Sequence, residues 1–345
     1  MFHHLSRGAE LTMAIDTTTA STPRLLQVGF SSQDLERTTA FFVTYLGFRP
    51  GQCIELSSGP YRQLIGLPES RLRLQRLHLG EECLEITQVL DPGPGQRPSR
   101  PIPTGSRSCD LWFQHICLVT SDLDWAIAEL QPALDAGLAT AVSTAPQTLP
   151  EWNRAAAGIR AFKFRDPEGH NLELLQFPAD KGDARWHPTA ADDRGKLLGI
   201  DHSAISVANT TASCRFYDEL LQLKLGGDGV NSGPTQDGLD GLLQTEVRIT
   251  AHRCPQGAGL ECLNYLPPNQ GLPIPADLAM QDRAHWQIRL QVDNLEAIAS
   301  QIETFKGRLL SPGIVELGPQ ADLFHAQRAL QVADPDGHRL QLVEA

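Results

Sequence analysis

The chain repeats one short pattern four times, and this repeat restricts its fold more than any other feature of its 345 residues. Each copy begins with His or Gln, continues with alternating apolar residues and has Asp or Asn seven positions after its start. The alternation is typical of a half-buried strand. The four copies begin QVGFSSQD at Gln27, HICLVTSD at His115, HSAISVAN at His202 and QIRLQVDN at Gln287.

The Asp or Asn of each copy is well placed to cap a following helix, because its side-chain oxygen can accept a hydrogen bond from a free backbone N–H group of the first turn. These expected caps are Asp34, Asp122, Asn209 and Asn294. The helix after Asp34 should end at Gly47, since glycine readily adopts a left-handed conformation. The helical pattern of the second copy contains Pro132, which predicts an end or a kink just before that residue.

The copies start 88, 87 and 85 residues apart, which leaves room in each for one strand, one helix and several further strands. In the first three copies, a short apolar strand with a central carboxylate follows the starting His or Gln by 58, 58 and 59 residues, and the fourth copy has an amide in that place. These closing residues are Glu85, Glu173, Glu261 and Gln341. The sequence therefore predicts an α+β fold, in which four βαβββ modules pair into two cup-shaped domains.

The domain boundaries are expected in three stretches rich in Pro and Gly, at 91–106, 178–196 and 266–283. The second and fourth copies contain the turn Asp-Pro-acid-Gly-His and the other two lack it, which favours a larger repeat made of two consecutive copies. The expected division is a disordered leader (1–24), a first domain (25–178, modules 25–90 and 110–178), a linker (179–196) and a second domain (197–345, modules 197–266 and 284–345).

Composition restricts the partners of the chain. Its net charge of −12 and its lack of a basic block argue against binding to nucleic acid or to an anionic membrane surface. No window has the roughly 20 apolar residues that a membrane span needs. The seven cysteines form no CxxC pair, which suits reduced thiols. We therefore expect a cytoplasmic monomer or homodimer that acts on a small molecule.

The copies resemble modules of the vicinal oxygen chelate superfamily, which includes lactoylglutathione lyase (glyoxalase), extradiol dioxygenases and bleomycin-resistance proteins. In that family two modules form a cup, and first-strand and last-strand residues of both modules hold a divalent metal ion. The resemblance implies glyoxalase-like domains. For consecutive copies it implies a metal site at Gln27, Glu85, His115 and Glu173, a set similar to that of eukaryotic-type lactoylglutathione lyases. A second, poorer site would consist of His202, Glu261, Gln287 and Gln341.

The chemistry of the first set agrees with this resemblance. Two carboxylates would neutralise a divalent cation such as Zn, Ni, Co, Mn or Fe, and the cation would account for the burial of Glu173 in an apolar strand. The leading hypothesis is a metal-dependent lyase or isomerase that chelates an oxygenated small molecule and stabilises an enediolate or similar oxyanion. The resemblance assigns proton transfer to Glu173.

Two alternatives stay open. A non-haem iron dioxygenase that cleaves a C–C bond would use two histidines and one carboxylate, and here His202 would need His285 as its partner. A metal-free binding protein would instead hold an apolar ligand in a cup lined by aromatic residues such as Trp112, Phe113 and Phe177.

Overall fold

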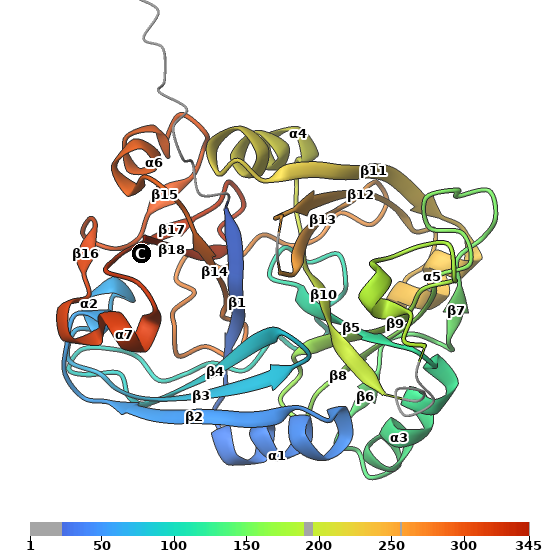
Figure 1. Ribbon diagram of the computed structural model, residues 1–345, viewed down its shortest axis with the longest axis horizontal. Coiled ribbons are helices and arrows are strands. Elements are labelled where there is room, and N and C mark those ends of the chain that lie inside the picture. The colour runs from blue at the N-terminus through green and yellow to red at the C-terminus, as the bar shows by residue number, and fades with distance from the viewer. Residues whose placement is uncertain (1–22, 190–195, 256, 345) are drawn as a thin grey trace, which may run out of the picture.

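The computed structural model describes residues 23–189, 196–255 and 257–344, and in this part of the chain two nine-stranded sheets lie side by side (Figure 1). The expected disordered leader lies outside the described residues up to position 22, and the first strand begins at Arg24. The described residues contain no helix long and apolar enough to cross a membrane. All seven cysteines are described, and none forms a disulfide.

We call the sheet that contains the first strand sheet A. In spatial order it consists of β15 (Arg308–Leu309), β17 (Arg328–Ala333), β18 (Arg339–Glu344), β14 (Trp286–Gln291), β1 (Arg24–Ser31), β4 (Glu82–Asp91), β3 (Arg71–Leu79) and β2 (Arg49–Leu56), with β16 (Val315–Glu316) beside β17.

The other sheet is sheet B. It consists of β11 (Lys224–Ser232), β12 (Glu246–Arg253), β13 (Gly259–Tyr265), β10 (Leu197–Ser206), β5 (Gln114–Thr120), β9 (Asn171–Gln176), β8 (Arg160–Arg165) and β6 (Thr140–Ala141), with β7 (Gln147–Thr148) beside β8.

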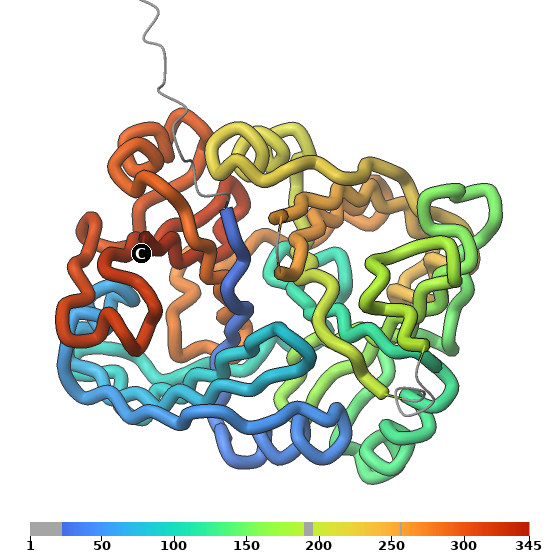
Figure 2. Tube along the Cα trace, in the orientation of Figure 1, coloured from blue at the N-terminus to red at the C-terminus, as the bar shows by residue number. Residues whose placement is uncertain are grey.

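Sheet A therefore joins the first copy to the fourth, and sheet B joins the second to the third. The colours of Figure 2 show this pairing, because the blue and red parts of the chain share one half of the molecule and the green and yellow parts share the other. The copies meet through their first strands, which run antiparallel: β1 beside β14, and β5 beside β10. The four βαβββ modules and two cups agree with the expected fold class.

The expected pairing of consecutive copies, which gave domains 25–178 and 197–345, is wrong. Strands pair through backbone hydrogen bonds, and the first strands of all four copies offer nearly the same backbone edge and the same alternation. The repeat thus defines the modules without defining which two share a sheet.

Helices from the four copies pack between the sheets. They are α1 (Leu35–Leu46), α3 (Leu123–Asp135), α4 (Thr210–Cys214) with its π-helical continuation η3 (Arg215–Leu220), and α6 (Leu295–Gln301). The four expected caps are confirmed, since each Asp or Asn side chain accepts a hydrogen bond from a backbone N–H group in the first turn. Gly47 ends α1 in the left-handed conformation. Pro132 does not end α3, which continues to Asp135.

Four short helices lie outside this layer: α2 (Tyr61–Leu64), α5 (Pro234–Asp240), α7 (Ala321–Phe324) and the 3-10 turn η1 (Ala184–Trp186), with a further 3-10 turn, η4 (Gly318–Gln320), before α7. The two Asp-Pro-acid-Gly-His turns connect modules of different sheets. His170 Nε2 lies 2.9 Å from the carbonyl oxygen of Ser31, and His338 Nε2 lies 2.8 Å from that of Leu111. These turn histidines therefore brace sheet A against sheet B.

Candidate functional site

Four side chains from sheet B converge where the second and third copies meet. His115 and His202 lie on the two central antiparallel strands, β5 and β10. Glu173 on β9 and Glu261 on β13 lie on the strands that run parallel to them, opposite Cys117 and Ala204 respectively. We call these four residues and the concave face around them cup B.

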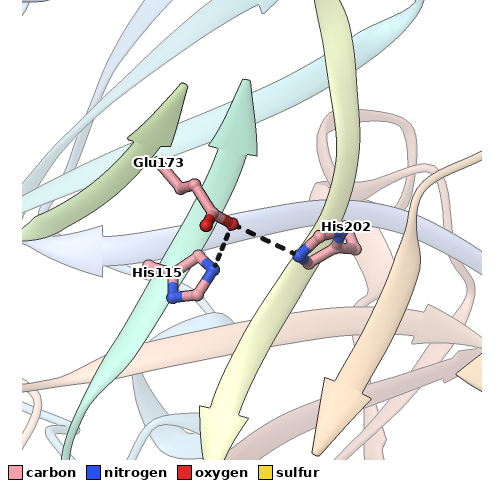
Figure 3. A group of neighbouring side chains, drawn as sticks. All are labelled: His115, Glu173 and His202. Carbon is pink, nitrogen blue, oxygen red and sulfur yellow. Dashed lines mark ion pairs between the residues drawn. The ribbon is translucent and has the colours of Figure 1, made fainter. Parts of the chain in front are cut away.

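The donor atoms of cup B are close together. Glu173 Oε2 lies 3.2 Å from His115 Nε2 and 3.9 Å from His202 Nε2, and both histidines and Glu173 can offer ligand atoms within 4.8 Å of one another (Figure 3). Glu261 Oε2 lies 3.5 Å from His202 Nε2 on the other side. The histidines and Glu173 are buried, whereas the side chain of Glu261 is 19% exposed.

These side chains fit a divalent cation. Ligand atoms about 2.0–2.2 Å from one ion lie about 3–4 Å from each other, which is the range found here. Neither ring nitrogen of His115 has a well-directed hydrogen bond in the described part of the chain, although the ring is 2% exposed. A buried imidazole without such partners is costly unless another group, such as a metal ion, occupies its lone pair. Two imidazoles and two carboxylates form a mixed nitrogen and oxygen set suited to Zn, Ni, Co, Mn or Fe.

The charges around Glu173 favour its ionised form. Burial alone would raise the pKa of Glu173, but Lys163 and His115 lower it to about 2. Burial is also the main cause that lowers the pKa of His115. In contrast, Glu261 and Asp201 outweigh burial at His202 and raise its pKa. The cup thus presents an ionised carboxylate beside an imidazole that stays neutral.

A cavity of about 290 Å³ lies against the four residues. Its walls combine aliphatic side chains with the backbone of a glycine-rich stretch of β11, which contains Gly226, Gly227 and Gly229. The aliphatic wall consists of Leu149, Ile159, Leu175, Leu239, Ile249 and Leu263. Such a space suits a small molecule with an apolar part whose polar end meets the four donor side chains.

A buried ion pair also lines this cavity. Lys163 on β8 lies opposite Glu173 in the strand ladder, and its Nζ donates a 2.6 Å hydrogen bond to Asp240 Oδ1 at the end of α5. Gln236 Nε2 donates a 2.7 Å hydrogen bond to Asp240 Oδ2. Because the carboxylate only accepts, this bond fixes the amide orientation and leaves Gln236 Oε1 without a partner in the described residues. Lys163 thus places a hydrogen-bond donor, and Gln236 a hydrogen-bond acceptor, beside the four side chains of cup B.

Sheet A forms the equivalent structure from the first and fourth copies, which we call cup A. Its four corresponding residues are Gln27, Glu85, Gln287 and Gln341. A guanidinium lies among them: Arg289 Nη2 is 3.2 Å from Glu85 Oε1 and donates a 2.8 Å hydrogen bond to Gln341 Oε1. Arg76 Nε contacts Glu85 Oε2 at 3.3 Å. Burial would raise the pKa of Glu85, but the two arginines lower it.

Cup A does not fit a metal ion. Arginine carries a permanent positive charge, and Arg289 already occupies the carboxylate that a cation would need. Short helices also fill the concave face. Tyr61 of α2 stacks on Phe324 of α7 with ring centroids 4.1 Å apart, and its hydroxyl accepts a 3.1 Å hydrogen bond from Gln341 Nε2. The guanidinium carbon of Arg289 lies 5.0 Å from the Phe324 ring.

The structure therefore groups the expected site residues into other sets than consecutive copies would give. Gln27 and Glu85 belong to sheet A and do not meet His115 and Glu173, because β1 pairs with β14 rather than with β5. Likewise, Gln287 and Gln341 do not meet His202 and Glu261. Each expected set is therefore divided between the two cups. Both histidines of the two sets lie in cup B, and cup A contains neither.

His285 also lies in the wrong place to be a partner of His202. It precedes β14 of sheet A, with its Nδ1 3.4 Å from Ser31 Oγ, and burial lowers its pKa to about 3. Of the aromatic residues expected to line a ligand cup, Phe177 lines the cavity of cup B, whereas Phe113 packs into an apolar cluster.

The sequence reasoning missed Lys163 and Asp240. Lys163 had a signal, since it is a charged residue within the apolar strand FKF just before the Asp-Pro-acid-Gly-His turn. Asp240 had none, because only the packing of α5 against sheet B brings it to Lys163.

Comparison with known proteins agrees with this architecture. Residues 24–174 match the sequence model of the Glyoxalase/Bleomycin resistance protein/Dioxygenase superfamily. A comparison with curated proteins gives no match. Among solved structures, the chain is similar to glyoxalase I from Zea mays (14% identity, 94% of this chain and 92% of that chain covered, TM-score 0.54). It is also similar to a proposed dioxygenase from Bacillus subtilis subsp. subtilis str. 168 (10% identity, 94% and 86% covered, TM-score 0.53). At these identities the likeness concerns the fold.

Proposed function

Since residues 24–174 match the sequence model of the glyoxalase, bleomycin resistance protein and dioxygenase superfamily, we propose that the chain is a member of it and a divalent-metal-dependent enzyme acting on a small oxygenated molecule in cup B. The observation that carries the proposal is the convergence of His115, Glu173, His202 and Glu261 beside a cavity. We further propose a lyase or isomerase reaction, a cytoplasmic location and a monomer or homodimer that binds neither nucleic acid nor membrane.

The metal would be held by His115 Nε2, His202 Nε2 and the carboxylate of Glu173, with Glu261 beside this site. A bound divalent ion would act as a Lewis acid that polarises a substrate carbonyl and stabilises the oxyanion next to it. Lys163 would add positive charge on the Glu173 side of the cavity, and Gln236 Oε1 would accept a hydrogen bond from a substrate hydroxyl or amide.

Proton transfer suits Glu261 better than Glu173. Glu173 is buried between His115 and Lys163, and the charge of Lys163 together with the contact to His115 holds it in the ionised form and makes it a weak base. The residue opposite Glu261 in its ladder is the uncharged Ala251, the Arg253 guanidinium lies 4.0 Å away, and Glu261 keeps part of its side chain exposed. We therefore assign removal of a proton from the carbon beside the carbonyl to Glu261, and a ligand role to Glu173, to which the family resemblance had assigned this step.

The test begins with the metal. Elemental analysis of the purified protein should find about one divalent transition metal per chain, and chelation should lower the melting temperature. Proton NMR in D₂O then measures proton abstraction. The measured quantity is the rate at which the C–H hydrogen beside the carbonyl exchanges with solvent, in a panel of small α-hydroxy and α-keto compounds. Glu261→Gln should retain the metal and lose at least about 100-fold in exchange rate, within the range for general bases. Glu173→Gln should lose metal instead.

A second candidate is favoured by one observation. Two histidines and one carboxylate within 4.8 Å match the ligand set of non-haem iron oxygenases, and the partner of His202 in this set is His115 rather than His285. Oxygen consumption by the anaerobically iron-loaded protein on adding a catechol would support this reaction. A protein without metal and indifferent to chelators would contradict both candidates and favour a metal-free binding protein.

A further inference from the structure

Asp201 directly precedes the proposed ligand His202, and in a regular strand these two side chains would lie on opposite faces of the sheet. The strand is irregular here. In the pairing of β10 with β5, Ile200 lies opposite Leu118 and His202 lies opposite Cys117, so that Asp201 is an extra residue in a bulge. Bulges near active sites often redirect one side chain. As a result, Asp201 Oδ2 lies 2.8 Å from His202 Nδ1.

This hydrogen bond determines which atom of His202 faces the other donor side chains. With Nδ1 bonded to a carboxylate, the proton of a neutral ring resides on Nδ1, and the lone pair is on Nε2. Nε2 is the atom that lies 3.9 Å from Glu173 and 3.5 Å from Glu261.

Two further groups hold the Asp201 carboxylate in place. Trp186 Nε1 donates a 3.2 Å hydrogen bond to Oδ1, and both terminal nitrogens of Arg253 lie 3.2 Å from Oδ2. Asp201 is 8% exposed.

Cup A has the same bulge without the carboxylate. Leu25 lies opposite Leu290 and Gln27 lies opposite Arg289, which leaves Leu26 as the extra residue of β1. Leu26 packs against an apolar cluster. Within cup B, His115 also lacks such a partner, because its Nδ1 has no hydrogen bond among the described residues. The carboxylate is therefore specific to His202.

We propose that Asp201 is a positioning residue, which fixes the ring of His202 with Nε2 toward the donor set and thereby strengthens its hold on a divalent ion. The inference rests on the proposed function, since it concerns the metal of cup B. Carboxylate partners of this kind orient metal-binding imidazoles and raise their basicity, and losing one costs about 10–100-fold in metal affinity.

The experiment measures Zn²⁺ affinity of the full chain by competition with a chromophoric chelator. Asp201→Leu, which copies the residue of cup A, should bind Zn²⁺ about 10–100-fold more weakly. Asp201→Asn should recover most of this loss, because its amide oxygen can still accept the Nδ1 proton. Leu26→Asn makes a polar change at the equivalent bulge of cup A and should leave the affinity unchanged.

A second control separates positioning from bracing. Arg253→Met removes the ion pair of Asp201 and should lower the melting temperature of the metal-free protein, but it keeps the bond to His202 and should not weaken Zn²⁺ binding. The inference is overturned if Asp201→Leu binds Zn²⁺ as tightly as the wild type, or if Arg253→Met weakens binding as much as Asp201→Leu does. A wild-type chain that binds no divalent metal at all would overturn the proposed function itself.

Discussion

Cup A and cup B are built from the same module, yet they neutralise a buried carboxylate in opposite ways. In cup A, Glu85 is fully buried and meets the guanidinium of Arg289, which is part of the chain. In cup B, the equivalent acids face two imidazoles and a cavity. A buried carboxylate needs a positive partner, and a chain can supply that partner itself or leave the place for a metal ion. The comparison favours a structural role for cup A and supports the proposal that cup B is the functional site.

One position accounts for much of this difference. Two residues after the first His or Gln of each copy stand Gly29, Cys117, Ala204 and Arg289. In cup B both residues are small, whereas in cup A a guanidinium extends from this position to Glu85. Tyr61 and Phe324 then fill the remaining concave face of cup A.

The largest expected effect tests the structural role of cup A. Arg289→Met leaves Glu85 with Arg76 as its remaining cationic partner and should lower the free energy of unfolding by about 3–5 kcal/mol, the usual cost of breaking a buried ion pair. Urea denaturation with chelator present measures this effect. The double variant Glu85→Gln with Arg289→Met removes the unpaired charge and should recover part of the loss. A single variant as stable as the wild type would mean that Arg289 does not hold cup A together.

The next effect concerns the proposed metal site of cup B. Zn²⁺ at 100 times its dissociation constant should stabilise the wild type by about 2.7 kcal/mol, and His202→Ala should lose this gain. Gln287→Ala changes the equivalent residue of cup A and should retain the stabilisation by Zn²⁺. Thermal denaturation with and without Zn²⁺ compares the variants. If the gain disappeared in Gln287→Ala and persisted in His202→Ala, the roles of the two cups would be reversed.

The smallest expected effect is at Tyr61. Tyr61→Phe removes the hydroxyl that accepts hydrogen bonds from Gln341 and Gln287, and should cost about 1 kcal/mol of unfolding free energy. The Zn²⁺-dependent gain in stability should be the same as in the wild type. A change in Zn²⁺ affinity in this variant would show that the cups are coupled, contrary to their independent roles.

Local sequence signals predicted much of the fold. The four N-caps and the end of α1 at Gly47 follow from interactions within a few residues, so they could be inferred without knowing the tertiary structure. The spacing of the first-strand and closing residues also identified two strands of each module that lie side by side in the sheet. These features depend on the period of a strand and the geometry of one turn.

The pairing of modules carried a signal that was overlooked. The second and third copies begin with His, and the first and fourth begin with Gln. A metal site built from two modules has the most imidazole ligands when the two copies that begin with His share a cup. This favours the pairing that the structure has. The Asp-Pro-acid-Gly-His turns pointed the other way, because they recur in every second copy, yet their histidines contact the opposite sheet rather than joining two copies into one cup.

The sequence by itself determined the module and the residue type at its first-strand and closing positions, because these follow from alternation along a strand and from the spacing within one copy. Only the tertiary structure decided which modules share a sheet, since backbone hydrogen bonds between nearly identical strand edges do not distinguish the copies. It also decided that Glu85 meets Arg289 while Glu173 meets His115 and His202. The charge of a buried site depends on neighbours distant in sequence, and these are fixed only when the strands pair.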